Sequence, residues 1–563
     1  MDGILANHWG ERRPNGYDIV VVGSGYGGAI TAARLSTASL NPRLSVCLLE
    51  RGQEWPVGQF PDSLDGILAN SYNPVLNRLG LYEFDAFPDI AVIKGSGLGG
   101  TSLVNANVAI RPEPDVFATW PSAVYRASQI GETKPGSLWN YYKMAEETLD
   151  VSSHPTGSSL KKFQALKKRA VQLGQVVETL PLAVNFQKEG VEVYQSNSKS
   201  IVKHKCIDCG DCVTGCNVGA KNTLYMNYLP LAKIGGTHIF TQAEVDFIEQ
   251  GVSGDWVVHV THRDDVLSSE EVTIPARIVI LAAGALGSAR ILLRSQQQGL
   301  ATSACVGTRF GGNGDFFGLA YNSNQITETI GWGNHKNDDP IAQVVRAGPS
   351  IVGLVRYHEK ASPSERFVIE DLSFPRAYRD AAAAAFRLLP GVPAGTQDPD
   401  QAQQRLDNDL LGADPRGALN STMLYLCVAQ DNSGGTMTLD DFGELQITWP
   451  GAGTEAIFNQ VNQECLAHAT ALGSTFIENP IWKVSPWKTL ITAHPLGGCP
   501  MGEDGSDGAV DHLGRVFEGA GAEVYTGLYV ADGSIVRTAL GVNPFLTISA
   551  LSERIAYHIV SNM

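Results

Sequence analysis

The feature that most constrains the fold is a glycine-rich turn between a predicted strand and a predicted helix. Residues 17–22 form a short run rich in β-branched residues, and Gly23, Gly25 and Gly28 follow before a helical stretch at 29–35. The first glycine permits a tight turn, the second lets a pyrophosphate approach the backbone, and the third lets helix and strand pack closely. The helix N-terminus offers free N–H groups to the phosphates. This pattern predicts a dinucleotide-binding βαβ unit.

A carboxylate completes this motif. Residues 44–49 form a second predicted strand, and Glu50 follows it, about 20 residues after the last glycine. A carboxylate there accepts hydrogen bonds from an adenosine ribose. A glycine-rich turn alone also occurs in ordinary βαβ units, but the strand, the helix and the acid together favour dinucleotide binding. The motif by itself does not distinguish NAD from FAD.

A second glycine loop, at residues 95–107, has no role in a simple Rossmann dehydrogenase. Its backbone N–H groups can reach a phosphate or the pyrimidine edge of a flavin, and its polar side chains can hydrogen-bond a cofactor. The candidate cofactor-binding residues in this loop are Gly97, Gly100, Thr101, Asn105 and Asn107.

Two later segments extend the pattern. Residues 278–292 are predicted to form a buried strand, a turn of small residues and a helix. Near the C-terminus, another predicted strand ends on Asp532 and Gly533, and Asn543 precedes the start of a further helix. The cofactor site is therefore expected to draw on segments from both ends of the chain.

These four blocks together resemble the glucose–methanol–choline (GMC) flavoproteins. The resemblance covers residues 17–112, is weak through the middle of the chain, and is strong over 488–556. The block 493–499, with the segment 541–551, is most similar to the cholesterol-oxidase branch. The resemblance implies an α/β Rossmann-like FAD-binding domain, built from discontinuous segments, and an α+β substrate domain with a large antiparallel sheet.

The resemblance also implies a division of the chain. We expect an FAD-binding domain made of residues 14–112, 222–318 and 488–563. The substrate-binding domain is then made of 113–221 and 319–487, and includes a cysteine-rich segment at 206–216.

The cofactor that the resemblance implies is non-covalent FAD. Covalent members of the family attach FAD through a histidine in the second glycine loop, and residues 95–107 contain none. Asp532 and Gly533 match the turn beside the phosphate and ribityl chain, and Val245 matches the place where backbone groups meet the adenine. Arg537 stands where many members carry Pro, and Asn107 where sterol oxidases tend to carry Gly. These departures leave the shape of the substrate pocket open.

The resemblance also identifies a catalytic pair. Hydride transfer from an alcohol leaves a hydroxyl proton, which a base must take, and histidine can do this near neutral pH. His494 occupies the position of the family's active-site histidine, and Asn543 occupies that of its partner, which can orient the substrate oxygen. A lone histidine before proline is otherwise ordinary loop chemistry. Sterol oxidases also use a glutamate from the substrate domain, for which Glu370 is a candidate.

Four cysteines have the spacing of a bacterial ferredoxin run: Cys206, Cys209, Cys212 and Cys216. Asn217 replaces the proline that usually follows. In ferredoxins the fourth cysteine of such a run ligates a different cluster, so a single run gives three direct ligands and needs a fourth from elsewhere, or holds a three-iron cluster. An iron–sulfur cluster is one interpretation, and zinc, disulfides or free thiols are the others.

The expected function is oxidation of an alcohol CH–OH group by hydride transfer to FAD. Electrons would pass to oxygen or to an external acceptor, and an iron–sulfur cluster would favour the second route. From the resemblance, the first expectation for the substrate is a bulky, apolar alcohol such as a sterol, while sugars and aromatic alcohols remain open. The alternative is a lyase or isomerase with redox-silent FAD on the same fold.

The composition argues against some classes of binding partner. Lys and Arg number 42 against 58 Asp and Glu, a net charge of -16, which argues against nucleic acid and anionic lipid as partners. The sequence contains no run of about 18 apolar residues, so no membrane span is predicted. The first 15 residues do not form a signal peptide, so we expect a cytoplasmic or other intracellular protein, or a secreted one if a leader has been removed.

A hexapeptide, Asp-Gly-Ile-Leu-Ala-Asn, occurs at residues 2–7 and again at 65–70. It is too short to be a structural repeat, and the sequence offers no physical account of it.

Overall fold

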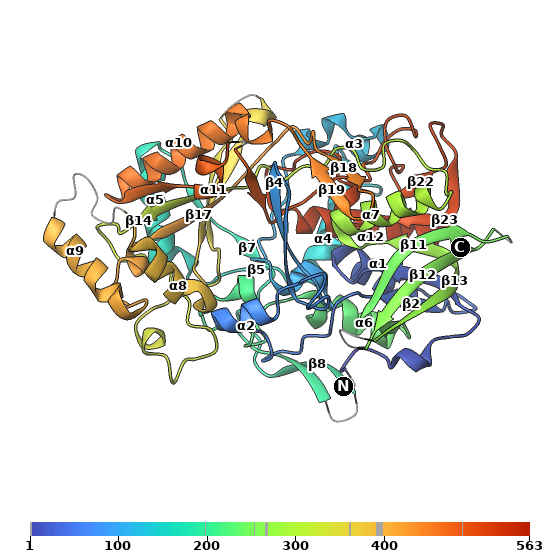
Figure 1. The fold of residues 1–563 in the computed structure, drawn as a ribbon, viewed down its shortest axis with the longest axis horizontal. Helices are drawn as coiled ribbons and strands as arrows, with labels where there is room; N and C mark the ends of the chain where they lie inside the picture. Colours follow the sequence, from blue (N-terminus) through green and yellow to red (C-terminus); the bar gives the residue numbers. More distant parts are fainter. Residues whose placement is uncertain are drawn as a thin grey trace.

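Two large β-sheets lie side by side along the long axis of the molecule (Figure 1). The computed structural model describes residues 3–196, 199–252, 254–264, 268–359, 362–389, 398–486 and 488–563. Both chain ends lie in the half that contains the first sheet (Figure 1).

The first sheet has eight strands, and its centre is parallel. Its main path is β10 (His238–Phe240), β2 (Val46–Leu49), β1 (Tyr17–Val22), β13 (Ser269–Leu281), β12 (Trp256–Arg263) and β11 (Ala243–Gln250). The end of β13 also pairs in parallel with β23 (Val524–Val530), which carries β22 (Arg515–Phe517). The buried, β-branched run of β1 sits between two parallel neighbours, as a strand covered on both faces requires.

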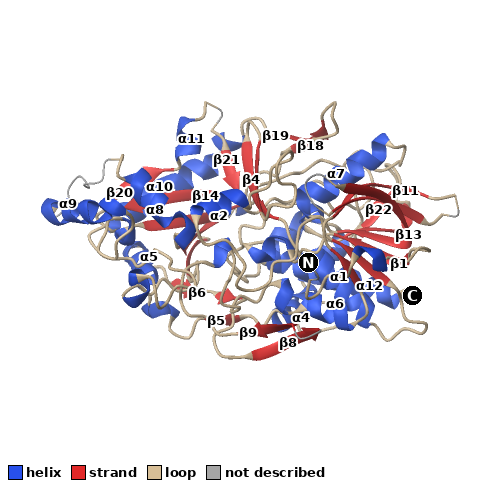
Figure 2. Ribbon diagram, turned by 60° about the horizontal axis from the view of Figure 1, so that its bottom comes forward, coloured by secondary structure: helices blue, strands red, loops and turns tan. Residues whose placement is uncertain are grey.

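Helices cover both faces of this sheet. On one side lie α1 (Tyr26–Thr37), α4 (Leu138–Thr148), α6 (Tyr228–Ile234) and α12 (Phe545–Ser561), and on the other lies α7 (Gly284–Gln297) (Figure 2). This arrangement is a doubly wound α/β domain, which confirms the expected fold class. No helix in the described part of the chain is both long enough and apolar enough to cross a membrane.

The second sheet is antiparallel throughout. Its order is β20 (Thr475–Glu478), β14 (Phe316–Tyr321), β17 (Met423–Ala429), β16 (Phe367–Leu372), β15 (Gly353–Tyr357) and β6 (Val177–Thr179). Two helices, α5 (Lys161–Gln172) and α10 (Ala456–Ala471), pack on it, and α8 (Arg376–Phe386) lies nearby. The large antiparallel sheet expected for the substrate side is therefore present.

The segments of the first sheet come from distant parts of the sequence. All its strands fall within the three ranges expected for the FAD-binding domain, and the six strands of the second sheet come mostly from the remainder. The expected boundary at residue 318 falls inside β14, which pairs only within the second sheet. The domain division itself stays a prediction.

A small three-stranded sheet connects the two halves. It contains β3 (Tyr82–Ala86), β4 (Ile90–Gly95) and β21 (Leu490–Thr492). β4 leads into the second glycine loop and β21 leads to His494, and the two strands pair in parallel, with Val92 opposite Thr492. Because parallel strands end at the same edge, this pairing brings the histidine block close to the glycine loop.

The remaining elements are short. They are α2 (Leu64–Ala69), α3 (Ser122–Ser128), α9 (Pro399–Asn408), α11 (Pro480–Val484), β5 (Ser152–Ser153), β7 (Pro181–Leu182), β8 (Val191–Ser196), β9 (Lys199–Lys203), β18 (Thr436–Leu439) and β19 (Leu445–Thr448).

The two copies of the hexapeptide adopt different conformations. The copy at 65–70 forms most of α2, capped by the Ser63 hydroxyl. The described part of the first copy has no regular structure, and the backbone N–H groups of Ile4, Leu5 and Ala6 donate to the Glu54 carboxylate. Tertiary partners decide the conformation of this peptide, so the repeat is not a repeated structural unit.

Candidate active site

The two glycine loops lie against each other. A Cβ atom at Gly100 would lie 2.9 Å from the Gly25 Cα, and one at Gly28 would lie 1.8 Å from the Gly23 carbonyl oxygen. At Gly25, by contrast, a Cβ would meet no other atom within 4 Å. Glycine is therefore needed for packing at Gly28 and Gly100, while Gly25 leaves the space that a phosphate needs to approach the backbone.

Glu50 ties the two loops together. Its carboxylate is buried and accepts hydrogen bonds from the Ser24 hydroxyl (2.5 Å), the Ser24 N–H (3.1 Å) and the Gly52 N–H (2.8 Å). The Ser24 hydroxyl also accepts from the Gly99 N–H and lies 3.3 Å from the Gly97 carbonyl. Burial raises the pKa of Glu50 above its ordinary value. A carboxylate has about four acceptor sites, so this one can still bind ribose hydroxyls.

Val245 lies on a strand that begins at the backbone of Glu50. β11 begins where the Ala243 N–H donates to the Glu50 carbonyl at 2.8 Å, and Val245 follows at a bulge in that strand. The structure thus brings the expected adenine contact next to the expected ribose contact.

Asp532 joins the third and fourth expected segments. One carboxylate oxygen accepts from the Ser534 N–H and hydroxyl, and the other accepts from the Gly284 N–H (2.8 Å) and the Ser288 hydroxyl (2.5 Å). Burial raises the pKa of Asp532. A Cβ at Gly533 would lie 3.5 Å from the Pro495 carbonyl, so this turn packs against the histidine block.

The polar side chains of the second glycine loop divide into two groups. Thr101 accepts a hydrogen bond from the Gly95 N–H, and the Asn105 amide donates to the Tyr26 hydroxyl, so both support the loop itself. The Asn105 amide oxygen and both amide atoms of Asn107 are buried without a hydrogen-bond partner in the described chain. Buried polar atoms are nearly always paired. These atoms therefore fit a polar cofactor bound against the loop.

Asn107 also has an unusual backbone. Its φ angle is 60°, in the left-handed region, where glycine and asparagine are the residues best tolerated. This explains how Asn can stand where the resemblance expects Gly. The other departure, Arg537, forms an ion pair with Asp507 at 2.6 Å, so the chain itself satisfies its charge.

His494 is held by a carboxylate that the sequence did not reveal. Its Nδ1 lies 2.7 Å from an oxygen of Asp315, which is buried and directly precedes β14. The other Asp315 oxygen accepts from the Ala493 N–H and the Thr492 hydroxyl. Because a carboxylate can only accept, we assign the proton to Nδ1, which leaves the second ring nitrogen of His494 as an acceptor.

Asn313, two residues before Asp315, holds the other side of the site. Its amide donates to the Val542 carbonyl (2.8 Å) and accepts from the Leu540 N–H (2.7 Å). The short segment 312–315 therefore positions both the histidine block and the loop that carries Asn543. Its sequence, Gly-Asn-Gly-Asp, was a signal that sequence reasoning missed, since turn residues there precede a buried strand.

Glu370 lies next to Asn543. The Asn543 amide donates to one Glu370 oxygen at 3.3 Å, while the other Glu370 oxygen and the Asn543 amide oxygen are buried without a partner in the described chain. Glu370 is fully buried in β16, and burial, together with the nearby carboxylates of Asp371 and Asp315, raises its pKa to about 8. The site thus combines an acceptor nitrogen, an amide and a carboxyl group able to hold a proton near neutral pH.

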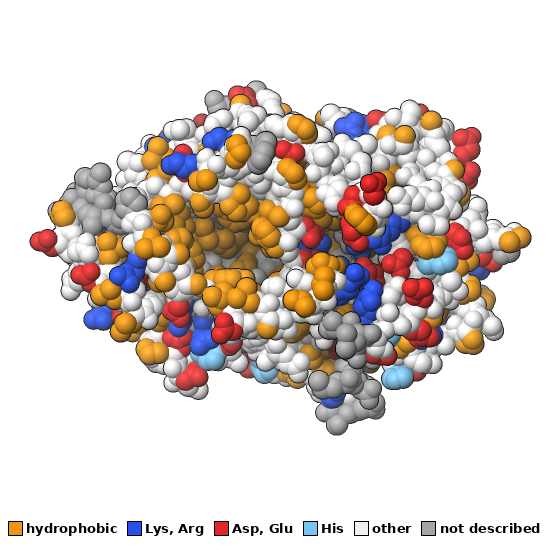
Figure 3. All heavy atoms as spheres, viewed as in Figure 1, with side chains coloured by type: hydrophobic (Ala, Val, Ile, Leu, Met, Phe, Trp, Pro, Cys, Tyr) orange, Lys and Arg blue, Asp and Glu red, His pale blue; other side chains and the backbone are white. Residues whose placement is uncertain are grey.

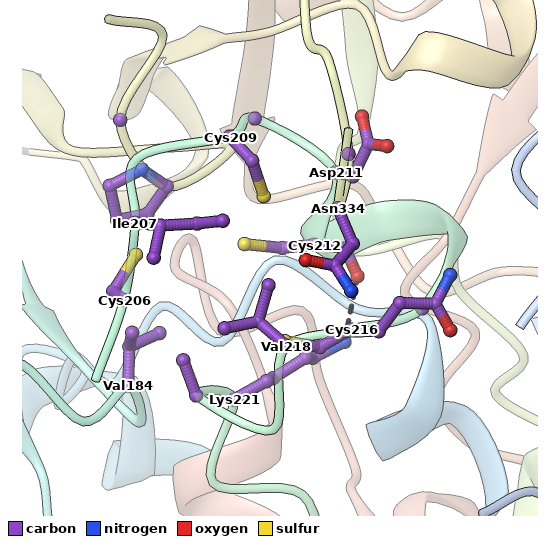
Figure 4. Close-up of a pocket in the computed structure, with 17 residues that line it drawn as sticks. Val184, Cys206, Ile207, Cys209, Asp211, Cys212, Cys216, Val218, Lys221 and Asn334 are labelled. Atoms are coloured by element: carbon purple, nitrogen blue, oxygen red, sulfur yellow. Dashed lines mark hydrogen bonds between the residues drawn. The ribbon is translucent and has the colours of Figure 1, made fainter. Parts of the chain in front are cut away.

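The four cysteines line a single cavity away from these residues (Figure 4). All four are free thiols. Figure 4 shows the side chains of Cys209 and Cys212 directed into the same space, with Cys206 across from them and Ile207 between. Among the described residues, no group of three or more His, Cys, Asp or Glu side chains is placed to hold one metal ion.

Comparisons with known proteins support this picture. The N-terminal model of the GMC oxidoreductases matches residues 18–311, and the C-terminal model matches 459–552. A cholesterol oxidase of Mycobacterium tuberculosis is 26% identical over 96% of this chain and 90% of its own length. A cholesterol oxidase of Acinetobacter baumannii is 25% identical over 96% and 93%, and a long-chain-alcohol oxidase of Arabidopsis thaliana is 24% identical over 97% and 67%.

Solved structures show the same fold. A formate oxidase of Aspergillus oryzae aligns with a TM-score of 0.62 over 98% of this chain and 99% of its own, at 13% identity. A fungal aryl-alcohol oxidase aligns with a TM-score of 0.59 over 98% and 100%, at 15% identity. With two family models matched over both halves of its cofactor-binding region, the chain belongs to the GMC oxidoreductases, a family of FAD-dependent enzymes.

Proposed function

We propose that this protein oxidises the CH–OH group of an alcohol. FAD, when bound, accepts the hydride from the alcohol carbon. The observation that carries the proposal is the geometry of two pairs: His494, held through Nδ1 by Asp315, and Asn543, paired with Glu370. One oxygen of Glu370 and the amide oxygen of Asn543 are buried without a partner in the described chain. A site that only stored a cofactor would have no need for buried proton acceptors left without partners.

These side chains suit the proton that the alcohol must release. The free ring nitrogen of His494 accepts the hydroxyl proton, and the Asn543 amide orients the substrate oxygen. Glu370 is a second proton acceptor, because a pKa of about 8 makes its ionised form a stronger base than an ordinary carboxylate; only a minor part of it is ionised at neutral pH. Asp315 stabilises the charge that His494 gains.

We propose a bulky, apolar alcohol as substrate. A deep hollow lined by hydrophobic side chains opens on one face of the molecule (Figure 3), where Figure 1 places β17 between α8 and β4, with α2 below. On α2, Leu68 is 63% exposed. Such a surface favours apolar molecules over sugars. The relatives named as cholesterol and long-chain-alcohol oxidases also point to this class.

We further propose that FAD is bound without a covalent link and that oxygen reoxidises it. Residues 95–107 contain no histidine to attach a flavin. Oxygen is the acceptor in the reactions for which the oxidase relatives are named. Acid precipitation should then release free FAD, and turnover with alcohol in air should release hydrogen peroxide.

The test is anaerobic mixing of the holoprotein with a panel containing a sterol, a long-chain primary alcohol, an aryl alcohol and a sugar. The apolar alcohols should bleach the flavin absorbance and yield the corresponding carbonyl product. Bleaching by the sugar alone would refute the substrate class. No bleaching by any alcohol, with conversion of a substrate at constant flavin absorbance, would instead support the lyase or isomerase alternative.

A further inference from the structure

The cysteine cavity is not used by the proposed alcohol chemistry. Cys206, Cys209, Cys212 and Cys216 line it together, although in ferredoxins the fourth cysteine of such a run serves another cluster. Here the chain turns back within the run, with positive φ angles at Asp208, Gly210 and Gly215. All four ligand candidates therefore come from one segment and meet in one place.

The substrate half of the molecule holds this segment in position. The Trp332 N–H donates to the Cys209 carbonyl at 2.9 Å, and the Gly348 N–H donates to the Asp208 carbonyl at 3.1 Å. The Asp208 carboxylate in turn binds Arg346 at 2.6 Å. The arrangement of the thiols is thus fixed by contacts outside the run, as a preformed site requires.

Buried positive charge faces the cavity. Lys221, which is 1% exposed, lines it and donates from Nζ to the Cys212 carbonyl (2.9 Å) and the Leu103 carbonyl (3.0 Å). Among the described residues it forms no ion pair with a carboxylate, and it lines the cavity together with the thiols of Cys212 and Cys216. Burying an ammonium group without a counter-charge is costly. An anionic group ligated by these thiols would supply that counter-charge.

The position of the cysteines in the sequence favours a cluster over a single zinc ion. Structural zinc sites more often take their ligands from two separated pairs of residues. These four cysteines lie within one run, residues 206–216, with the spacing of a ferredoxin run.

The cavity is also connected to the expected flavin site. Leu103, the second acceptor of Lys221, ends the 3-10 turn Gly100–Leu103 of the second glycine loop. One buried lysine therefore bridges the cysteine segment and the loop that carries the candidate FAD contacts.

We propose that Cys206, Cys209, Cys212 and Cys216 ligate one iron–sulfur cluster of the four-iron, four-sulfide type, beside the second glycine loop. Lys221 provides positive charge to this anionic cluster. Apolar side chains such as Val184 and Val218 line the cavity around it. The proposal concerns a second cofactor and is independent of which alcohol, if any, the flavin oxidises.

The experiment is chemical analysis of the full-length holoprotein purified without oxygen. Iron and acid-labile sulfide should each be present at about four atoms per chain, and dithionite should produce a low-temperature EPR signal from a reduced cluster. Protein that contains neither iron nor sulfide, and takes up neither on anaerobic incubation with ferrous iron, sulfide and dithiothreitol, would overturn the proposal. One zinc ion per chain would overturn it equally.

Matched cysteine variants sharpen the result. Cys209→Ser should lower bound iron and sulfide by at least about tenfold, whereas Cys305→Ser, a thiol outside the cavity, should retain both. Equal loss in the two variants would contradict the assignment. If Cys209→Ser does not fold, the metal content of the unmodified protein still decides. FAD content and bleaching by alcohol are measured separately, so failure of the alcohol proposal leaves the iron result intact.

Discussion

The nucleotide side and the reactive side of this site are built in opposite ways. On the nucleotide side, Glu50 and Asp532 each accept several hydrogen bonds from the chain itself, and glycines allow backbone segments to touch. On the reactive side, Glu370 and Asn543 keep buried polar atoms without a partner in the described chain.

Substitutions in the two regions should therefore affect different properties. Carboxylates that accept hydrogen bonds from the chain hold the loops together, so changing them should weaken cofactor binding through the local structure. Unsatisfied buried atoms cost stability, and they are retained where a ligand pairs with them. Substitutions on the reactive side should therefore alter rates while leaving FAD in place, and the following experiments test that separation.

The largest effect is expected at His494. Acid–base assistance is typically worth about 10²–10⁴-fold, so His494→Ala should slow anaerobic flavin reduction by about that factor while the protein stays yellow. His494→Gln should recover some positioning and none of the proton transfer. Stopped-flow absorbance measures both variants. An unchanged reduction rate in His494→Ala would remove this residue from the mechanism.

The pH profile should report Glu370. Its pKa of about 8 means that the carboxyl group is mostly protonated below that pH and cannot accept a proton. If it serves as a base, flavin reduction should rise by about 10–10²-fold between pH 6 and 8 and then level off. Glu370→Gln cannot ionise and should lose this rise. A wild-type profile without a transition near pH 8 would contradict the role.

Asp315→Asn tests the clamp on His494. The amide keeps the volume of the side chain but lacks the charge that fixes the protonated Nδ1. Loss of such an orienting partner typically costs about 10–100-fold, and the loss should fall on the reduction rate. Rapid-reaction kinetics measures the rate of flavin reduction, and the flavin content of the purified variant measures FAD binding. Loss of FAD at an unchanged rate would show that Asp315 acts on folding.

On the nucleotide side, Glu50→Ala should lower FAD affinity. Loss of hydrogen bonds to a charged acceptor costs about 1.5–3 kcal/mol, or about 10–100-fold in the dissociation constant. Because Glu50 also binds Ser24 and Gly52, Glu50→Gln should fall between the wild type and the alanine variant. Titration of apoprotein with FAD measures the affinity, and circular dichroism checks the fold. Full occupancy at low protein concentration would exclude Glu50 as a ribose ligand.

The smallest effect is expected for Asn543→Ala. It removes one neutral hydrogen bond to the substrate oxygen, worth about 0.5–1.5 kcal/mol, so reduction should slow by about 2–10-fold. The variant also leaves Glu370 without its amide donor. The pKa of Glu370 in the pH profile of this variant should therefore move upward, because the hydrogen bond from Asn543 lowers that pKa in the wild type. A rate loss as large as that of His494→Ala would contradict an orienting role.

Much of the cofactor region was predictable because its signals are local. The turn at Gly23–Gly28, the carboxylate at Glu50 and the Asp532-Gly533 turn each depend on neighbours within one strand–turn–helix unit. The structure brings these segments together as the motifs implied, and the fold and family are confirmed. The roles of the individual site residues remain predictions.

The sequence by itself determined which chemical groups are present and which short segments carry them, because glycine turns, strand patterns and cysteine spacing act over a few residues. Only the tertiary structure decided which distant groups meet. Asp315 reaches His494 across 179 positions and Glu370 reaches Asn543 across 173, through pairing of strands and turns that no local pattern specifies. The raised pKa of Glu370 has the same origin, since burial depends on the elements packed around a side chain and not on its neighbours in sequence.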